Sequence, residues 1–447
     1  MSRKSNGAPA FPTPLSAPRL LEIVRAAFRS IPEHRSGNGI AIPLVDALMS
    51  GLAIFGLKYP SLLDFDDHRN DTTVRHNLKT LYGVESAPCD TQLRSILDGV
   101  DPDRVRPAYV AVHELAERQG LFKQYEYLDG ACLLSVDGTG HFSSGEIQCP
   151  QCCVKRHRDG SEEYYHQLLG AVVVRPGYKT VIPFAPEAIL KEDGKEKNDC
   201  ERNAAKRLMT KLKAEYPDLK LIVVEDGLAA NGPHIKLLKS LGHHFIIVAR
   251  PGDHEALFKA VDEKYARGEV EEFETVDDEG VVHGYRYVNG VALNGSHPDL
   301  NINFLEYWEV KKGKEGNWSW VTDFELNKET VERIMRGGRC RWKVENEAFN
   351  TLKNQGYHLE HNYGHGHQYL ATVFGLLAFL AFLIDQLQEM GCGLFQQARQ
   401  VRVSRISLWE HLRGLFMWFF IPSCEAVWRS IIHKHAAMGM VAINDTS

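Results

Sequence analysis

Two aspartates stand directly after short apolar runs. The run Cys132–Val136 leads into Asp137, and the run Leu219–Val224 leads through Glu225 into Asp226; a glycine follows each aspartate. Open α/β sheets build their sites at the carboxyl ends of strands, so both aspartates are expected where ligands bind. A carboxylate on a buried strand needs a partner to offset its desolvation. A divalent metal is one such partner and a hydrogen-bonded turn or helix cap is another; the spacing alone leaves both open.

A helix predicted to begin at Arg341 supplies a third carboxylate. Arg341, Glu345, Phe349 and Lys353 step by four and are expected to share one helix face. A solvated helix with two ordinary charge pairs would show the same spacing, but Trp342 and Phe349 indicate burial close by. The chemical interpretation puts Glu345 over the sheet edge, where it completes a metal site.

The string that begins at Arg341, RWKVENEAFNTLKNQGYHLEHNYGHG, resembles the glutamate region of bacterial insertion-sequence transposases with an Asp-Asp-Glu triad. It is most similar to the group with a Tyr/Arg/Glu/Lys signature around the glutamate. The string KNDCERNAAKR (197–207) and the runs entering Asp137 and Asp226 resemble the same group. The similarity covers roughly residues 132–369 and is weaker in the N-terminal part.

The resemblance implies an α/β fold with a ribonuclease-H-like mixed sheet, an antiparallel β insertion and helical regions at both ends. Asp137, Asp226 and Glu345 would be the catalytic residues and would hold Mg²⁺, for which Mn²⁺ would substitute. The implied activity is cleavage at the ends of the protein's own element and strand transfer into target DNA. The expected partners are the inverted-repeat ends, the target DNA and a second copy of the chain.

Two other functions remain open: a related nuclease that cuts without integrating, and a DNA-binding protein or repressor without catalysis. The expected compartment is the bacterial cytoplasm, with nucleoid association when DNA is bound. Membrane association is not expected.

DNA contacts are expected near Glu345. Three basic residues would reach phosphates: Arg339, Arg341 and Lys353. The resemblance also implies that an aromatic side chain of the β insertion stabilises a flipped base, because stacking on a base is worth about 1–3 kcal/mol. The candidates are Trp308, Trp318 and Trp320, of which Trp320 is the residue predicted to contact DNA; core packing of the insertion is the alternative for each.

The signature is incomplete in two places. Gly338 stands where the signature tyrosine is expected, three residues before Arg341. Lys353 follows Glu345 by eight residues, one more than the usual pattern. Roles specific to the signature, such as handling a hairpinned DNA end, therefore do not follow from the triad.

A partial zinc motif lies between the two aspartates. Cys149, Cys152 and His157 give the pattern C-x2-C-x4-H, close to the spacing of structural zinc ligands. His166 or Cys200 would complete the ligand set, and a cysteine-rich surface turn is the alternative. The histidines after the glutamate helix are expected to bind phosphate or backbone groups instead of metal: His358, His361, His365 and His367.

Composition indicates a globular chain of two to four domains, with 447 residues, 44% hydrophobic and 25% charged. The net charge of -6 neither excludes nor favours DNA, because acid gathers in residues 261–280 and base in 333–353. The nine irregularly spaced cysteines indicate a reducing compartment. The apolar run 370–384 is shorter than the roughly 20 residues of a membrane span, which favours a buried helix.

The chain is divided into six predicted regions. These are a disordered lead-in without a secretory signal (1–18), a helical N-terminal domain and candidate DNA-binding unit (19–127), the first part of the catalytic core (128–250), the β-rich insertion (251–325), the second part of the core with the glutamate helix (326–390), and a helical C-terminal region (391–447).

Overall fold

The computed structural model describes residues 14–37, 40–194, 197–402, 404–433 and 441–442. Most of the predicted lead-in therefore lies outside the described residues. Leu15 is buried against Gly391, and helix α1 (Ala17–Arg29) begins two residues before the predicted boundary. Pro18 lies in the first turn of α1, where its missing N–H is not needed.

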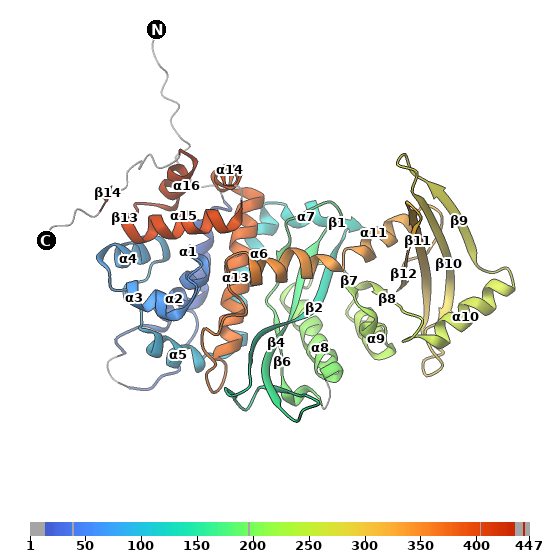
Figure 1. The fold of residues 1–447 in the computed structure, drawn as a ribbon, viewed down its shortest axis with the longest axis horizontal. Coiled ribbons are helices and arrows are strands. Elements are labelled where there is room, and N and C mark those ends of the chain that lie inside the picture. Colours follow the sequence, from blue (N-terminus) through green and yellow to red (C-terminus); the bar gives the residue numbers. More distant parts are fainter. Residues whose placement is uncertain (1–13, 38–39, 195–196, 403, 434–440, 443–447) are drawn as a thin grey trace, which may run out of the picture.

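One mixed sheet runs through the described part of the chain, in the order β3-β4-β2-β7-β8-β12-β11-β10-β9 (Figure 1). β2 is parallel to β7 and β7 to β8, whereas β2 and β4 are antiparallel. The predicted mixed α/β class is confirmed. The strand bounds are β2 (Ala131–Ser144), β3 (Cys153–Arg156), β4 (Glu162–Val174), β7 (Leu221–Glu225), β8 (His244–Val248), β9 (Glu271–Val276), β10 (Val282–Ala292), β11 (Asn301–Lys311) and β12 (Lys314–Thr322). Short strands β1 (Glu126–Leu128), β5 (Ile182–Pro183) and β6 (Glu187–Ile189) pair with β2 or β4.

The strand that carries Asp137 is longer than its apolar run. β2 was expected to end at Asp137, but it continues to Ser144 because Gly138–Ser144 pairs with β4. Asp226 does follow the last residue of its strand, Glu225, as predicted.

The β-rich region predicted over 251–325 begins with a helix, α10 (Glu255–Ala266), before its four strands. β12 pairs with core strand β8, with Trp320 opposite Val248 and Thr322 opposite Ile246. The insertion is therefore a continuation of the core sheet, and it forms the end of the molecule remote from the first and last helices of the chain (Figure 1).

Helices from both ends of the chain lie together at the other end of the molecule (Figure 1). The N-terminal helices are α1, α2 (Leu44–Gly56), α3 (Leu62–His68), α4 (Thr72–Asn77), the π-helical η1 (Leu78–Tyr82), α5 (Asp90–Asp98), η2 (Pro102–Arg104), α6 (Arg106–Arg118) and α7 (Leu121–Tyr125). The C-terminal ones are α14 (Gly393–Val401), α15 (Arg405–Trp418) and α16 (Cys424–Ile432). A two-residue strand, β13 (Phe419–Phe420), pairs with β14 (Val441–Ala442).

Helix α13 (Leu370–Gly391) runs between this helical body and the sheet (Figure 1). It is long and apolar enough to cross a membrane, but its whole apolar window is buried inside the protein. It packs against α2, α5 and α14, and Tyr109 of α6 donates a hydrogen bond to the Leu376 carbonyl at 2.6 Å. Burial on every side explains its mostly apolar sequence, and the predicted buried helix over 370–384 is confirmed.

A buried ion pair joins four segments of the helical body. Lys58 Nζ lies 2.6 Å from Asp385 Oδ2, and their side chains are 0% and 8% exposed. Tyr357 also donates to Asp385, at 2.6 Å, while the Lys58 ammonium lies over the rings of Tyr357 and Trp409. Burial lowers the pKa of Lys58, although Asp385 opposes that shift.

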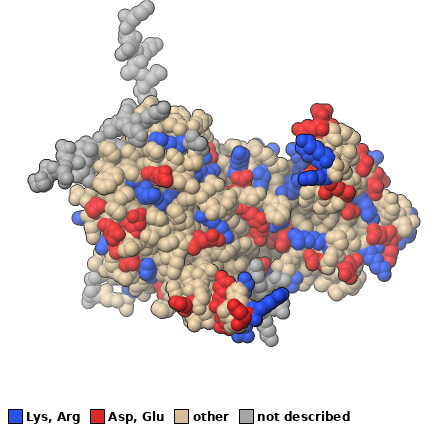
Figure 2. Space-filling view, in the orientation of Figure 1, with Lys and Arg blue, Asp and Glu red and all other residues tan. Residues whose placement is uncertain are grey.

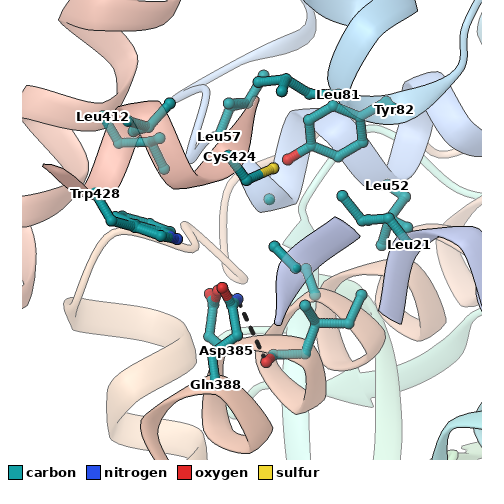
Figure 3. A pocket seen from close by; sticks show the side chains of 15 residues that line it. Leu21, Leu52, Leu57, Leu81, Tyr82, Asp385, Gln388, Leu412, Cys424 and Trp428 are labelled. Carbon is teal, nitrogen blue, oxygen red and sulfur yellow. Dashed lines mark hydrogen bonds between the residues drawn. The ribbon is translucent and has the colours of Figure 1, made fainter. Parts of the chain in front are cut away.

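The helical body also contains a small cavity of about 50 Å³. Leu21, Leu52 and Tyr82 face it from the N-terminal helices, and Asp385 and Trp428 face it from the C-terminal ones (Figure 3). Helices far apart in the sequence thus share one core at this point.

Candidate active site

The two aspartates meet where β7 leaves the sheet. Parallel pairing aligns Ser135 of β2 with Val224 of β7. Two residues beyond this pair stand Asp137, still on β2, and Asp226, the residue that follows β7; both line one hollow of about 50 Å³. Asp226 Oδ1 also accepts the N–H of Leu228 at 3.0 Å. The hydrogen-bonded turn that was the alternative to a metal site is therefore present at this residue.

Glu345 reaches Asp137 from a helix with one irregular turn. Val344–Phe349 form the π-helical turn η5, which α12 (Asn350–Asn354) follows. A π turn takes one residue more than an α turn, and such turns are frequent at functional sites. Because of this extra residue, the eight-residue interval from Glu345 to Lys353 covers the same number of turns as seven residues on a regular helix. Lys353 is therefore expected on the same helix face as Glu345.

A glycine of β4 lets this helix approach the sheet. Gly170 pairs with Asp137, and a Cβ at Gly170 would lie 2.6 Å from Cε1 of Phe349. Phe349 is buried on the sheet-facing side of η5 and contacts Phe379 of α13. The missing side chain at Gly170 therefore sets how closely Glu345 approaches Asp137.

We expect Gly170→Ala to lower the free energy of unfolding by about 1–3 kcal/mol, because Phe349 must shift to admit the methyl group. The same shift should move Glu345 and weaken any chemistry that depends on this carboxylate and Asp137 together. Chemical denaturation and an activity assay would measure the two effects. Gly140→Ala is the matched control, since no atom lies within 4 Å of a Cβ at this β2 position; equal effects of the two variants would contradict the prediction.

One arginine serves both carboxylates. Arg341 Nη1 lies 3.1 Å from Asp137 Oδ2 and 3.6 Å from Glu345 Oε1, and its side chain is 6% exposed. Burial and a hydrogen bond with Glu345 raise the pKa of Asp137 to about 6, although the Gly138 N–H and Arg341 oppose that shift. The two carboxyl groups are thus held near a single arginine, which offsets their repulsion.

The hollow contains further polar side chains that the sequence patterns did not single out. Glu201 and Arg202 of α8 (Lys197–Glu215) line it, as does His234 of α9 (Gly232–Ser240). Arg202 and His234 also line an adjoining cleft of about 700 Å³, together with Lys206. The string KNDCERNAAKR contains Glu201, Arg202 and Lys206, so the resemblance marked the segment without assigning the residues a role.

A buried pair supports the end of β7. His234 Nε2 lies 2.6 Å from Glu225 Oε2, and both side chains are less than 10% exposed. Burial lowers the pKa of His234, but the Glu225 carboxylate outweighs it and the net shift is upward. Asn231 caps α9 by accepting the His234 N–H at 3.0 Å, which fixes the position of this histidine.

Two of the expected DNA contacts are not presented to solvent. Trp320 is 1% exposed and belongs to the core where β12 joins β8, so its ring offers no open face for a base in this structure, and the alternative of core packing describes it. The Arg341 guanidinium pairs with the carboxylates instead of reaching outward. In contrast, Trp342, which was expected to indicate burial, is 49% exposed and lies 4.0 Å from the Arg341 guanidinium.

The other expected contacts remain at the surface. Arg339 is 40% exposed, bonds Glu309 at 2.9 Å and lies over the half-buried ring of Trp318. Lys353 is 24% exposed and pairs with Glu360 at 2.7 Å. Trp308 is half-buried and donates to Glu274 at 3.1 Å.

No protein-family model matches this chain, and no curated protein is significantly similar to it.

A second group of potential metal ligands lies apart from the carboxylates. Among the described residues it is the one group of three or more such side chains whose donor atoms all lie within 4.8 Å of one another. Its members are Cys149, Cys152, His166 and His365. The expectation of a possible metal-binding cluster around the two cysteines is thereby supported.

The ligand set differs from the predicted one. His157 lies outside the group, because it sits at the turn between β3 and β4 and pairs with Glu163 at 3.3 Å. His166, one of the two residues expected to close the set, belongs to it. Cys200 does not, since its thiol donates to the Gly194 carbonyl at 3.6 Å. His365, expected to avoid metal, is the fourth member.

Proposed function

We propose that this protein is a DNA transposase that cleaves the ends of its own element and joins them to target DNA. The observation that supports it is that two further carboxylates, from separate parts of the chain, lie near Asp137. Asp137 shares a hollow with Asp226 and the Arg341 guanidinium with Glu345, although roughly 200 residues separate Asp137 from Glu345. A protein that only bound DNA would have no need to hold like charges together.

The strand order supports the ribonuclease-H-like part of the proposal. The first aspartate lies on a central strand, the second follows the neighbouring parallel strand, and the glutamate arrives on a helix after the β insertion. This is the order that the resemblance to insertion-sequence transposases implies.

The donor set fits magnesium, which prefers oxygen ligands and keeps several waters. Asp137, Asp226 and Glu345 offer only carboxylate oxygens, and Mn²⁺ would accept the same ligands. When bound, such ions would activate an attacking water or 3′-hydroxyl and stabilise the leaving oxygen.

The chain's own residues orient these ligands. The Leu228 N–H holds Asp226, and Arg341 holds Asp137 and Glu345 at the same time. Trp342 and Arg339 stand exposed beside this site, where a nucleic acid could stack on one and place a phosphate near the other.

The partners proposed are the inverted-repeat ends and target DNA, bound by a homodimer that pairs the two ends. The cleft beside the hollow would take the DNA backbone, with Arg202 and Lys206 as phosphate contacts. Elsewhere the charges are mixed: Figure 2 shows basic and acidic side chains interspersed over the face in view. Sequence-specific contacts would then fall to the N-terminal helical region.

Cleavage of a linear duplex that carries the gene's flanking DNA tests the proposal. With Mg²⁺ or Mn²⁺, the wild type should nick the DNA at the repeat boundary, and Asp226→Asn should not. This variant is the cleaner choice, because asparagine can still accept the Leu228 N–H, whereas Asp137→Asn would take the nearest negative charge away from buried Arg341.

Binding and folding are measured beside cleavage. Asp226→Asn should shift the same duplex in a gel and give the same circular dichroism spectrum as the wild type. Cutting by Asp226→Asn at the wild-type rate would overturn the assignment. Specific binding by a folded wild type that never cuts would instead favour a DNA-binding protein or repressor, and cutting without joining would favour a nuclease.

A further inference from the structure

We propose that Cys149, Cys152, His166 and His365 form a structural zinc site that ties the segment after the glutamate helix to the β3–β4 hairpin. Cys149 and Cys152 stand in the turn before β3, and His166 lies on β4. His365 comes from the segment between α12 and α13, 213 residues after Cys152.

The distances between the donor atoms match a tetrahedron. The two Sγ atoms lie 3.9 Å apart, and the sulfur-to-Nε2 distances are 3.4 Å for Cys149–His166, 3.6 Å for Cys152–His166 and 3.3 Å for Cys152–His365. Zinc–sulfur bonds of about 2.3 Å and zinc–nitrogen bonds of about 2.05 Å give tetrahedral edges of roughly 3.8 Å and 3.6 Å. The other two distances, from Cys149 and from His166 to His365, are within 4.8 Å, so a single ion at the centre would reach all four donors once these side chains adjust.

Hydrogen bonding alone does not satisfy this arrangement. The Cys152 thiol has one proton but faces the donor atoms of all three other members within 3.9 Å. A disulfide does not account for it either, since a sulfur–sulfur bond would measure about 2.05 Å. The Cys149 N–H donates to Cys152 Sγ at 3.3 Å, an orientation suited to a thiolate ligand.

The surroundings indicate a structural site. Cys152 and His166 are 1% and 4% exposed, and Phe142 packs its ring 4.4 Å from that of His365. Four protein donors leave no open position for a substrate, which is the arrangement of structural zinc. The site is independent of the proposed DNA chemistry, so neither proposal fails with the other.

Metal analysis of the full chain tests the inference. After a chelator wash, the wild type should retain about one zinc ion per chain. Protein stripped of its zinc at mildly acidic pH and then given Co²⁺ at neutral pH should develop the visible absorption of tetrahedral thiolate coordination. Two variants should lose the metal while keeping the wild-type circular dichroism spectrum: Cys152→Ser and His365→Asn.

Two matched controls separate this ligand set from the local sequence motif. Cys153→Ser should keep the metal, because the Cys153 thiol donates to the Ile189 carbonyl at 3.7 Å. His157→Asn should keep it as well, although the C-x2-C-x4-H spacing includes this residue. The proposal would be overturned if the wild type held no zinc and developed no absorption spectrum with Co²⁺. Loss of metal in His157→Asn with retention in His365→Asn would do so too.

Discussion

Glu345→Gln is expected to lower the rate of the proposed DNA cleavage by at least about a thousandfold. Metal-dependent stabilisation of the transition state is worth several kcal/mol, and each 1.4 kcal/mol that is lost slows the reaction about tenfold. The substitution keeps the size of the side chain and removes its charge. Arg341 stays paired with Asp137, so the local structure should persist. Single-turnover cleavage at saturating protein, compared with equilibrium binding of the same duplex, measures the effect.

Glu347→Gln is the matched control on the same helical turn. Glu347 belongs to η5 like Glu345, but none of the described contacts joins it to Asp137. We expect less than a threefold change in cleavage rate for this variant. If the two substitutions slowed cleavage equally, Glu345 would have no special role and the triad would have to be reassigned.

Lys58→Met should produce the largest loss of stability, about 3–5 kcal/mol, because it leaves Asp385 buried without its counter-charge. Methionine keeps the length of the side chain and its place beside Tyr357 and Trp409. Chemical denaturation followed by circular dichroism would measure the change in the free energy of unfolding. The double variant Lys58→Met/Asp385→Leu should recover most of the loss, since no buried charge remains.

The surface pair Lys79–Glu85 provides the control. Its atoms also approach to 2.7 Å, but its side chains are 63% and 61% exposed. Solvent screens such a pair, so Lys79→Met should cost less than about 1 kcal/mol. A Lys58→Met variant no less stable than Lys79→Met would show that the buried pair contributes nothing to the helical body.

The spacing of apolar residues predicted those strands and helices whose formation depends on one continuous segment of the chain. The apolar runs before Asp137 and Asp226 are strands, and the run from Leu370 is a buried helix. The end of β2 could not be predicted, because Gly138–Ser144 is polar and glycine-rich and becomes a strand only through its pairing with β4.

The two departures from the transposase signature have physical explanations. A Cβ at Gly338 would lie 2.4 Å from Nε1 of Trp320, so the ring of Trp320 fills the space that a larger residue at 338 would need. The extra residue between Glu345 and Lys353 is absorbed by the π turn. Neither could be predicted from the sequence, since both depend on contacts or hydrogen bonds that spacing does not encode.

The metal-ligand group shows the same limit. Spacing identified Cys149 and Cys152, which share one tight turn, but it selected the wrong histidine. His166 and His365 reach the cysteines through strand pairing and through a segment from the far end of the core. Ligands brought together by tertiary structure leave no regular interval in the sequence.

The shared core of the two helical regions has a consequence for synthesis on the ribosome. Lys58 meets Asp385, Asn77 donates to the carbonyls of Phe416 and Phe419 at 2.7 Å, and the cavity in Figure 3 is closed from both sides. The N-terminal helices are made first, yet they have no complete core until α13 to α16 have emerged. We therefore expect the N-terminal helices of a nascent chain to stay without their full core until this later segment has been made.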